Sequence, residues 1–220
     1  APTSPVRISE RDAVLVDLGG EARRFDLVTG DVLWAQNVGS DVNVLPAVGA
    51  GVVVVMDRRG ATTAFEAGTG QRRWSLEMRG DAAVIIGETV VVIQDQTAHA
   101  LSTVTGVHHW VRPIFGTLAD MVNFASQFVV ATKSQSVMLS GDGVITERLG
   151  PVLTLTATQD HLVAWGPTEA LVSVRAGTII TRWRLPPLTL ALQDRPALAT
   201  SQSALLFSND WTFQVWDDAR

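Results

Sequence analysis

The sequence lacks cysteine altogether, and this absence excludes several classes of chemistry. Among 220 residues there is no Cys, so a disulfide scaffold, a cysteine metal site and thiol catalysis are all excluded. Tyrosine is absent too, while Trp occurs seven times. The longest run of large apolar residues, Val52 to Met56, is far shorter than the roughly 20 residues of a membrane-spanning helix. The sequence therefore predicts no transmembrane segment.

Positive charge is scarce as well. The chain has 17 basic and 22 acidic residues, a net charge of −5, and Lys133 is its one lysine. Polyanions bind broad basic surfaces, so this balance argues against a nucleic-acid partner. With 46% hydrophobic and 18% charged residues, intrinsic disorder is excluded. Residues Ala1 to Pro5 show no signal-sequence pattern, and we expect a mature chain or an excised segment.

A repeat is the strongest feature that the sequence does contain. Three segments align without gaps: Phe25–Trp34, Phe65–Trp74 and Leu101–Trp110. Each begins with an apolar residue, has Thr-Gly four and five places later, and has Trp four places after the Gly. The residues that define the repeat are Gly30, Gly70, Gly106, Trp34, Trp74 and Trp110. Two weaker copies follow, at Ser140–Gly143 and Val172–Gly177.

Short β-branched runs alternate with turn residues between these segments. No window shows the 3.6-residue period of a helix, and each period of about 37 residues has room for four strands. In the second period the predicted strands are Val42–Val48, Val52–Met56, Thr62–Glu66 and Arg72–Glu77. Four short strands in about 40 residues are typical of a propeller blade. The prediction is an all-β fold, a β-propeller of about six four-stranded blades.

One propeller domain over residues 1–220 accounts for the whole sequence. The predicted blades are 5–39, 40–80, 81–116, 117–150, 151–186 and 187–220. In each good copy the Thr-Gly pair is expected to form the turn between strands three and four. Gly supplies a positive φ there, and the Thr hydroxyl can bond the turn backbone. The Trp then lies on the outermost strand and is expected to fill the space between adjacent blades.

The last blade has only three predicted strands, Ala197–Thr200, Ala204–Phe207 and Thr212–Trp216. Three explanations stay open. The blade is three-stranded, or the chain is part of a longer propeller, or the edge at Thr212–Trp216 pairs with another polypeptide. An exposed apolar strand edge invites pairing, so we expect this edge to bind a partner or to mediate self-association.

The pattern Phe-Asp-x-x-Thr-Gly-x-x-x-Trp resembles the quinoprotein (PQQ-like) β-propeller repeat family. That family includes quinoprotein alcohol dehydrogenases, an outer-membrane barrel-assembly lipoprotein and sensor regions of bacterial Ser/Thr kinases. The resemblance implies an extracytoplasmic place in the bacterial envelope. The function expected from it is a non-enzymatic scaffold or adaptor that binds protein partners. The alternative is a domain that senses a quinone or another small ligand, as part of a receptor such as a kinase.

Enzyme activity is not expected. The quinone of the dehydrogenases is held in an eight-bladed propeller by a Trp and adjacent cysteines with a calcium ion, as the resemblance implies, and this chain has no Cys and about six blades. We therefore expect no cofactor. His108 and His109 are adjacent on a predicted strand and point to opposite faces. Since His99 and His161 are assigned to other blades, no metal site and no catalytic residue is predicted.

Five residues are candidates for contact with a partner. Trp211 lies in a predicted hairpin, and Phe213 follows it on the strand with the open edge. Arg58, Arg59 and Arg72 belong to Arg pairs that, with Arg23-Arg24, are expected on hairpins along one edge. Because Arg and Trp are frequent at interface hot spots, a protein partner is the better interpretation than a nucleic acid.

Overall fold

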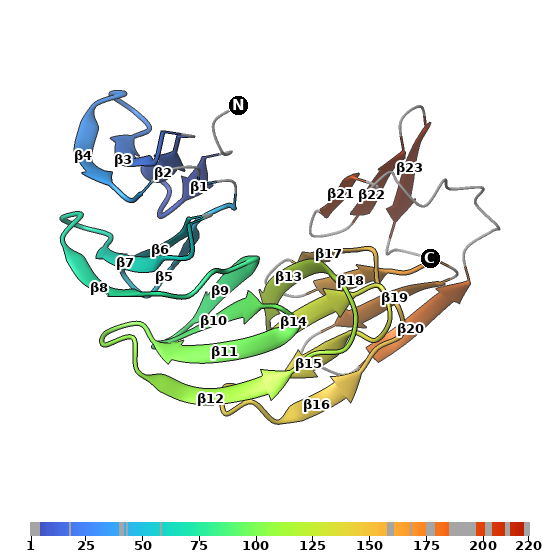
Figure 1. Ribbon diagram of the computed structural model, residues 1–220. Coiled ribbons are helices and arrows are strands. Elements are labelled where there is room, and N and C mark those ends of the chain that lie inside the picture. The colour runs from blue at the N-terminus through green and yellow to red at the C-terminus, as the bar shows by residue number, and fades with distance from the viewer. Residues whose placement is uncertain are drawn as a thin grey trace. The chain divides into compact units, whose positions relative to one another are not determined.

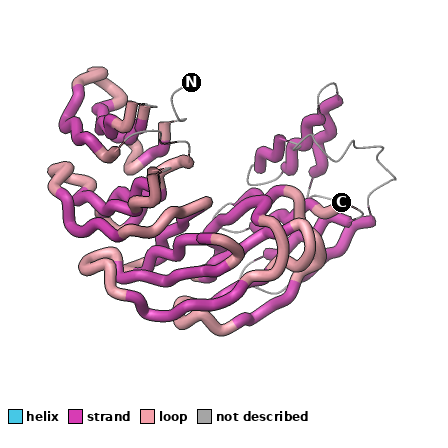
Figure 2. The backbone as a smooth tube through the Cα atoms, in the orientation of Figure 1, coloured by secondary structure: helices cyan, strands magenta, loops and turns pink. Residues whose placement is uncertain are grey.

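The computed structural model describes residues 5–17, 19–39, 42, 44–57, 59–157, 161–167, 169–174, 179–184, 197–200, 204–209 and 212–217. Side chains are described as far as residue 167, except that of His161. Within these ranges every regular element is a strand, and none is a helix (Figure 2). The same residues include no helix long and apolar enough to cross a membrane.

The strands form antiparallel sheets, which we number one to six in chain order. In each sheet the described strands pair with their neighbours in sequence (Figure 1). Sheets one to five have four strands each, and the described part of sheet six has three. This sequential pairing follows from the short apolar runs, since runs of about five residues separated by turns can only fold back on themselves.

The first three sheets use twelve strands. Sheet one has β1 (Val6–Arg7), β2 (Asp12–Val16), β3 (Glu21–Asp26) and β4 (Val32–Asn37). Sheet two has β5 (Ala47–Gly49), β6 (Val52–Met56), β7 (Thr62–Glu66) and β8 (Arg72–Leu76). Sheet three has β9 (Ala82–Ile86), β10 (Thr89–Gln94), β11 (Thr97–Ser102) and β12 (His108–Pro113).

The last three sheets use eleven. Sheet four has β13 (Leu118–Phe124), β14 (Gln127–Thr132), β15 (Val137–Leu139) and β16 (Ile145–Arg148). Sheet five has β17 (Thr154–Ala157), β18 (His161–Trp165), β19 (Glu169–Val174) and β20 (Ile179–Arg184). Sheet six has β21 (Ala197–Thr200), β22 (Ala204–Asn209) and β23 (Thr212–Asp217).

The chain divides into two compact units, Ala1–Ile114 and Phe115–Arg220. The first unit contains sheets one to three, and neighbouring sheets share cores. Val14 and Val16 of sheet one pack with Val53 and Phe65 of sheet two. On the other side of sheet two, a second cluster contains Val54, Met56, Val90, Val92 and Leu101. Stacked sheets thus bury faces that a single sheet leaves in water.

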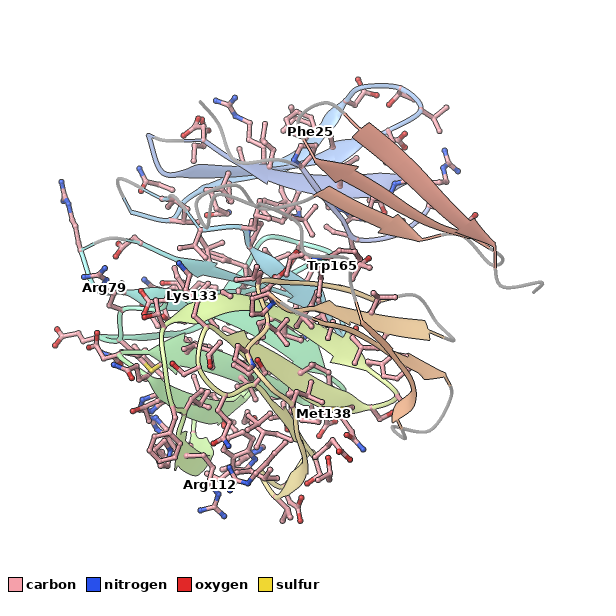
Figure 3. All side chains as sticks on the ribbon, turned by 90° about the vertical axis from the view of Figure 1, so that its right-hand side faces the viewer. Phe25, Arg79, Arg112, Lys133, Met138 and Trp165 are labelled. Atoms are coloured by element: carbon pink, nitrogen blue, oxygen red, sulfur yellow. The ribbon has the colours of Figure 1, made fainter. Side chains whose placement is uncertain are left out.

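The second unit contains sheets four to six. Its described core joins Val129 and Met138 of sheet four to Leu155 and Leu162 of sheet five. Trp165 on β18 is 2% exposed and lies among other side chains (Figure 3). The grouping of all six sheets into one domain over 1–220 stays a prediction, as do the blade boundaries.

A β-bulge recurs between the third and fourth strands of the first five sheets. The register shifts lie at Arg24/Phe25, Ala64/Phe65, Ala100/Leu101, Met138/Leu139 and Val172/Ser173. A bulge inserts one extra residue and increases the local twist. Because sheets four and five share it, the weak copies of the repeat keep the backbone pattern of the strong ones although their Thr-Gly-Trp residues are changed.

One predicted strand is wrong. The first strand of sheet two is Ala47–Gly49, not Val42–Val48. Pro46 lacks the N–H that a paired strand needs, so pairing begins only after it. Val42 is fully buried in the core between sheets one and two, so the apolar residue that suggested a strand is a loop residue that fills the core.

Candidate functional site

The Thr-Gly turns have the same backbone geometry in the first three sheets. Gly30, Gly70 and Gly106 have φ angles of 78°, 72° and 73°, as the sequence predicted. Each Thr hydroxyl accepts a hydrogen bond from the backbone N–H two residues later. The three pairs are Thr29–Asp31, Thr69–Gln71 and Thr105–Val107, at 3.3, 3.2 and 3.4 Å. These turns therefore supply hydrogen bonds to their own backbone.

The Trp of one sheet docks on the Thr-Gly turn of the next. Trp34, which follows the turn of sheet one, is 8% exposed, and its indole Nε1 donates to the Ala67 carbonyl oxygen at 2.9 Å. A Cβ placed on Gly70 would come within 2.8 Å of the Trp34 ring. The indole thus occupies the space that a side chain at position 70 would need.

The same dock occurs between sheets two and three. Trp74 Nε1 donates to the Thr103 carbonyl oxygen at 3.0 Å, and a Cβ on Gly106 would meet the Trp74 ring at 3.0 Å. The prediction that these Trp side chains fill the space between adjacent blades is confirmed for Trp34 and Trp74. Trp110, the third copy, lies half-buried on β12 at the end of the first unit.

Arg24 adds a polar link between sheets one and two. Its guanidinium donates to the carbonyl oxygens of Ala67 and Gly68 at 3.1 and 2.9 Å and to the Asp12 carboxylate at 2.7 Å. This hydrogen bond from Arg24 holds the pKa of Asp12 below its usual value. The Ala67 carbonyl therefore accepts from both Trp34 and Arg24, and the turn of sheet two is held by two side chains of sheet one.

The Arg pairs do not lie together on hairpins along one edge, which corrects the prediction. Arg23-Arg24 lies within strand β3, and Arg72-Arg73 begins strand β8. Carboxylates pair with three of these guanidinium groups: Arg23 with Glu21, Arg24 with Asp12, and Arg73 with Glu66. Because each such pair cancels a positive charge, the pairs do not form a basic surface.

The candidate partner residues are spread over the chain. Arg59 and Arg72 are exposed, but Arg59 precedes β7 and Arg72 follows the turn at its other end. They are therefore separated by the length of that strand. Arg58 and Trp211 lie outside the described residues. Phe213 is described only in its backbone, as the second residue of β23.

The histidines form a pair that the sequence prediction missed. His99 on β11 and His108 on β12 belong to the same sheet, and their ring centroids lie 5.6 Å apart in an edge-to-face arrangement. The assignment of His99 to another blade is therefore wrong. Burial, and then the nearby His108, lowers the pKa of His99. Two rings alone make no metal site, and the described residues include no cluster of three or more His, Cys, Asp or Glu suited to a metal ion.

Three glycines in the loops between sheets were also missed. Gly39, Gly80 and Gly116 follow the repeat Trp by five, six and six residues. A Cβ on each would lie 2.4 Å from the Asp57 carboxylate, 2.1 Å from the Met56 sulfur and 2.7 Å from Ser134, respectively. The near-constant spacing after Trp was the signal that could have identified these close backbone approaches.

The residues of this chain do not fit the quinone cofactor that the dehydrogenases of the repeat family bind. The sequence has no cysteine, so the adjacent-cysteine half of that site has no counterpart. Asn occurs at four positions, Asn37, Asn43, Asn123 and Asn209. The described part of the chain contains no group of three or more acidic or His side chains that could bind a metal ion. No step of quinone chemistry follows from this chain.

Comparison with known proteins identifies relatives of this chain. The sequence model of the family described as outer membrane protein assembly factor BamB matches residues 18–148. The outer membrane protein assembly factor BamB of Bordetella pertussis is 33% identical over 100 residues, 41% of this chain. The matched segment spans 26% of that relative's length.

Solved structures show the same architecture. BamB from Moraxella catarrhalis superposes with a TM-score of 0.75 at 18% identity, over 99% of this chain and 72% of that one. The C-terminal WD40 domain of Sif2 gives a TM-score of 0.72 at 12% identity, over 98% and 66%. At these identities the likeness shows the fold, which is an all-β propeller. Since the family match covers more than half of the sequence, the chain belongs to the PQQ-like β-propeller family described as outer membrane protein assembly factor BamB.

Proposed function

We propose that this protein is a non-enzymatic propeller scaffold of the bacterial cell envelope, which binds protein partners in outer-membrane protein assembly. The observation that carries the proposal is the match of residues 18–148 to the assembly-factor family. The Bordetella relative, 33% identical over 100 residues, carries the same name. Fold alone does not give function, so the proposal rests on these relatives.

The surface of the first unit suits a binding role. Large aliphatic side chains are exposed around the Thr-Gly turns of sheets one and three: Leu27, Val28, Val32, Leu33, Val104, Val107 and Val111. Exposed apolar clusters of this kind mark contact sites for other proteins. The docked Trp34 and Trp74 side chains join the neighbouring sheets that present these residues.

The proposed location is the periplasmic side of the envelope, as for an outer-membrane assembly factor. The expected partners are proteins, consistent with the net charge of −5, which disfavours polyanions. No observation favours the small-ligand sensor of a receptor kinase, and that alternative stays a prediction from the repeat alone.

The experiment is a binding measurement with purified proteins. The chain is immobilised and exposed to the purified outer-membrane assembly machinery of its source bacterium, with an abundant periplasmic protein as the negative control. We expect saturable binding of the machinery and none of the control. Binding that is equal for the two, or absent for both, would contradict the proposed role.

A functional measurement complements it. A strain that lacks its own assembly factor is given the gene for the intact protein, and the amount of folded outer-membrane protein is measured by its heat-modifiable mobility in gels. We expect folded protein to rise toward the level of the parent strain. The variant Trp74→Ala, which loses a dock between sheets, is expected to rescue less than Arg72→Ala.

A further inference from the structure

His99 lies on the side of sheet three that packs against sheet two. Its partner on the neighbouring strand is Val92, and residues opposite each other on paired strands share a face. Val92 belongs to the core cluster that also contains Val54 and Trp74 of sheet two. The His99 ring is therefore part of the face by which two sheets of the first unit are joined.

His108 brings a second ring to the same face. It pairs with Leu101, another residue of that core cluster. The centroids of the His99 and His108 rings lie 5.6 Å apart, with an angle of 69° between the ring planes. The β-bulge between β11 and β12 makes this contact, because Val111 pairs with His99 and unbroken alternation would place His109 on this face instead.

One nitrogen of the His99 ring is unsuited to carry a proton. Its Nδ1 atom is buried and meets no hydrogen-bond partner among the described residues. A neutral imidazole can keep its one proton on Nε2, which leaves Nδ1 as an acceptor. A charged ring has an N–H at both nitrogens, and the N–H at Nδ1 would then be a buried donor without an acceptor. Because an unpaired donor of a buried charged group is costly, the site favours the neutral ring.

Within sheet three, His108 is the titratable side chain that shares the face of His99. The inner strands β9 and β10 contain no charged residue. The other titratable groups of β12 have their neighbours on the opposite face: Arg112 pairs with Ala98, and His109 Nδ1 lies 3.5 Å from the Thr89 hydroxyl. The strands of this sheet therefore add no negative charge beside the two rings.

Sheet two faces the rings with charges that cancel each other. Its strand β6 contains no charged residue. Glu66 on β7 lies on the side of sheet three, because its strand partner belongs to the shared core, and Arg73 forms a salt bridge with it. Arg72 pairs on the side of sheet one. In the loop after β8, Arg79 lies 3.9 Å from Asp81, and Glu77 is exposed. Burial first, and His108 second, lower the pKa of His99, and no carboxylate opposes them.

The two rings lie on the strands that flank the turn on which Trp74 docks. The Thr103 carbonyl oxygen accepts the Trp74 indole N–H at 3.0 Å, and a Cβ on Gly106 would meet the same indole at 3.0 Å. Thr103 comes four residues after His99, and His108 comes two residues after Gly106. A force that separates the rings therefore acts on the two strands that hold this turn in place.

We propose that His99 and His108 form an acid-sensitive switch, which loosens β12 and the Trp74 dock when the pH falls from neutral to mildly acidic. Histidine gains its proton in this range, since its ordinary pKa is about 6.5. Charge on one ring opposes charge on the other, and a charged His99 carries an unpaired N–H at Nδ1. Separation of β12 from β11 removes both costs. The inference concerns the chain by itself and goes beyond the proposed scaffold role.

The direction of the pH effect follows from the lowered pKa of His99. The opened state binds the proton at the usual value of 6.5, while the closed state binds it only at lower pH. The closed state therefore keeps its full stability above about pH 7 and loses stability as the pH falls from about 6.5 toward the lowered pKa. Because β12 pairs with β11 alone within sheet three, it is the strand that this loss releases.

The test is amide hydrogen exchange of the intact protein, followed by NMR at about pH 7.5 and about pH 5.5. Protection factors are compared, because they are corrected for the intrinsic effect of pH on exchange. We expect the protection of the β12 amides and of the Trp74 indole N–H to fall by roughly tenfold or more at the lower pH. Strand β4 is the internal control, since it is the fourth strand of its own sheet and has no titratable side chain. Its protection is expected to change by less than about threefold.

Matched variants assign the effect to the ring pair. His108→Gln removes one of the two charges at an exposed position and is expected to reduce the loss of β12 protection to less than about threefold. His109→Gln makes the same change one residue later, on the other face, and is expected to keep the full loss. The proposal is overturned if β12 and β4 lose protection equally, if β12 loses none in the parent, or if the two variants behave alike. Both substitutions are at exposed positions, so both variants are expected to fold.

The outcome is separable from that of the proposed function, because hydrogen exchange is measured on the protein without a partner. If β12 keeps its protection at the lower pH while the assembly machinery still binds, the switch is wrong and the scaffold role stands. If β12 loses its protection and the machinery does not bind, the switch stands without that role.

Discussion

The indole of Trp34 lies against Gly70, 36 residues later in the chain, so closely that a Cβ at position 70 would come within 2.8 Å of the ring. The Trp of one repeat and the Gly of the next are therefore one structural unit. The Gly has two reasons to be present: its φ of 72°, which an L side chain rarely adopts, and the ring that covers it. The contact explains why the repeat needs both residues, although they never meet within one copy.

Replacing these glycines separates the two reasons. Gly30→Ala introduces only the backbone strain, which we expect to cost about 1–2 kcal/mol, because its Cβ meets nothing. Gly70→Ala carries the same strain and also displaces Trp34, and overpacking of this kind costs about 1–3 kcal/mol more. Urea unfolding of the two variants measures the difference. Equal losses would mean that the indole does not constrain position 70.

Deleting a docked indole should be far more damaging than deleting a neighbouring charge. Trp74 is 8% exposed and donates to the Thr103 carbonyl, so Trp74→Ala is expected to cost about 3–5 kcal/mol. Arg72 is exposed on the same strand, and Arg72→Ala is expected to change stability by less than about 0.5 kcal/mol. Urea midpoints for both variants check this, and coinciding midpoints would contradict the role of Trp74 in the core.

Much of the fold could be predicted from the sequence because the residues of the repeat determine the local backbone geometry. Thr-Gly predicted a turn with positive φ, and the apolar runs predicted the hairpins, since both are local properties. The dock was only half predictable. The sequence placed Trp34 between blades, but the partner on the far side, Ala67 with Gly70, depends on how two sheets stack, and spacing along the chain does not specify that.

The misses have similar physical causes. The sequence predicted a strand at Val42 because an apolar loop residue cannot be distinguished from an apolar strand residue by sequence alone. Only the packing shows that Val42 fills the core between sheets one and two. His99 and His108 meet across a pair of strands, nine residues apart, where no short motif points to the contact.

The loop glycines should be sensitive to a single methyl group. A Cβ on Gly80 would lie 2.1 Å from the Met56 sulfur and 2.9 Å from Val92, so Gly80→Ala is expected to cost about 1–3 kcal/mol by overpacking. Gly68→Ala is the matched control, because its Cβ meets nothing within 4 Å. Thermal unfolding of the two variants compares them. A Gly80→Ala variant as stable as Gly68→Ala would show that the loop moves aside freely.

The Asp12–Arg24 pair should make stability depend on acid pH. The hydrogen bond from Arg24 lowers the pKa of Asp12 from its usual 3.8, so the folded state holds this proton more weakly than the unfolded state. The stabilisation is complete above about pH 5 and is lost as the pH falls from about 4 through the lowered pKa. Carboxyl NMR titration of the protein should show this pKa, and Arg24→Met should raise it toward its usual value.

A stability profile gives the control for that pair. Between about pH 5 and pH 2, Asp12→Asn should flatten the decline of unfolding free energy, since one of the groups that drives it is gone. Glu10→Gln removes one negative charge from an exposed position nearby and should leave the decline closer to that of the parent. Identical profiles for the parent and Asp12→Asn would contradict the role of the pair.

Sheet six has a strand at its edge that could pair with another chain. In the described part of that sheet the order is β21-β22-β23, which puts β23 at one edge, with Phe213 opposite Ser208 and Val215 opposite Leu206. A strand of this composition, Thr-Phe-Gln-Val-Trp-Asp, pairs readily with another strand unless something covers or charges it. We expect it to pair either with a partner protein or with a second copy.

Phe213→Lys puts a charge on that strand and tests both routes. If copies pair through β23, light scattering should show a mass that falls to that of the monomer in the variant. If a partner pairs there instead, the parent should be monomeric, and the variant should capture the assembly machinery at least tenfold more weakly. Gln214→Lys, one position along the same strand, tests whether any added charge has this effect. Unchanged mass and unchanged capture in Phe213→Lys would mean that β23 does not pair with another chain, because a lysine on a pairing edge could not be neutral in both measurements.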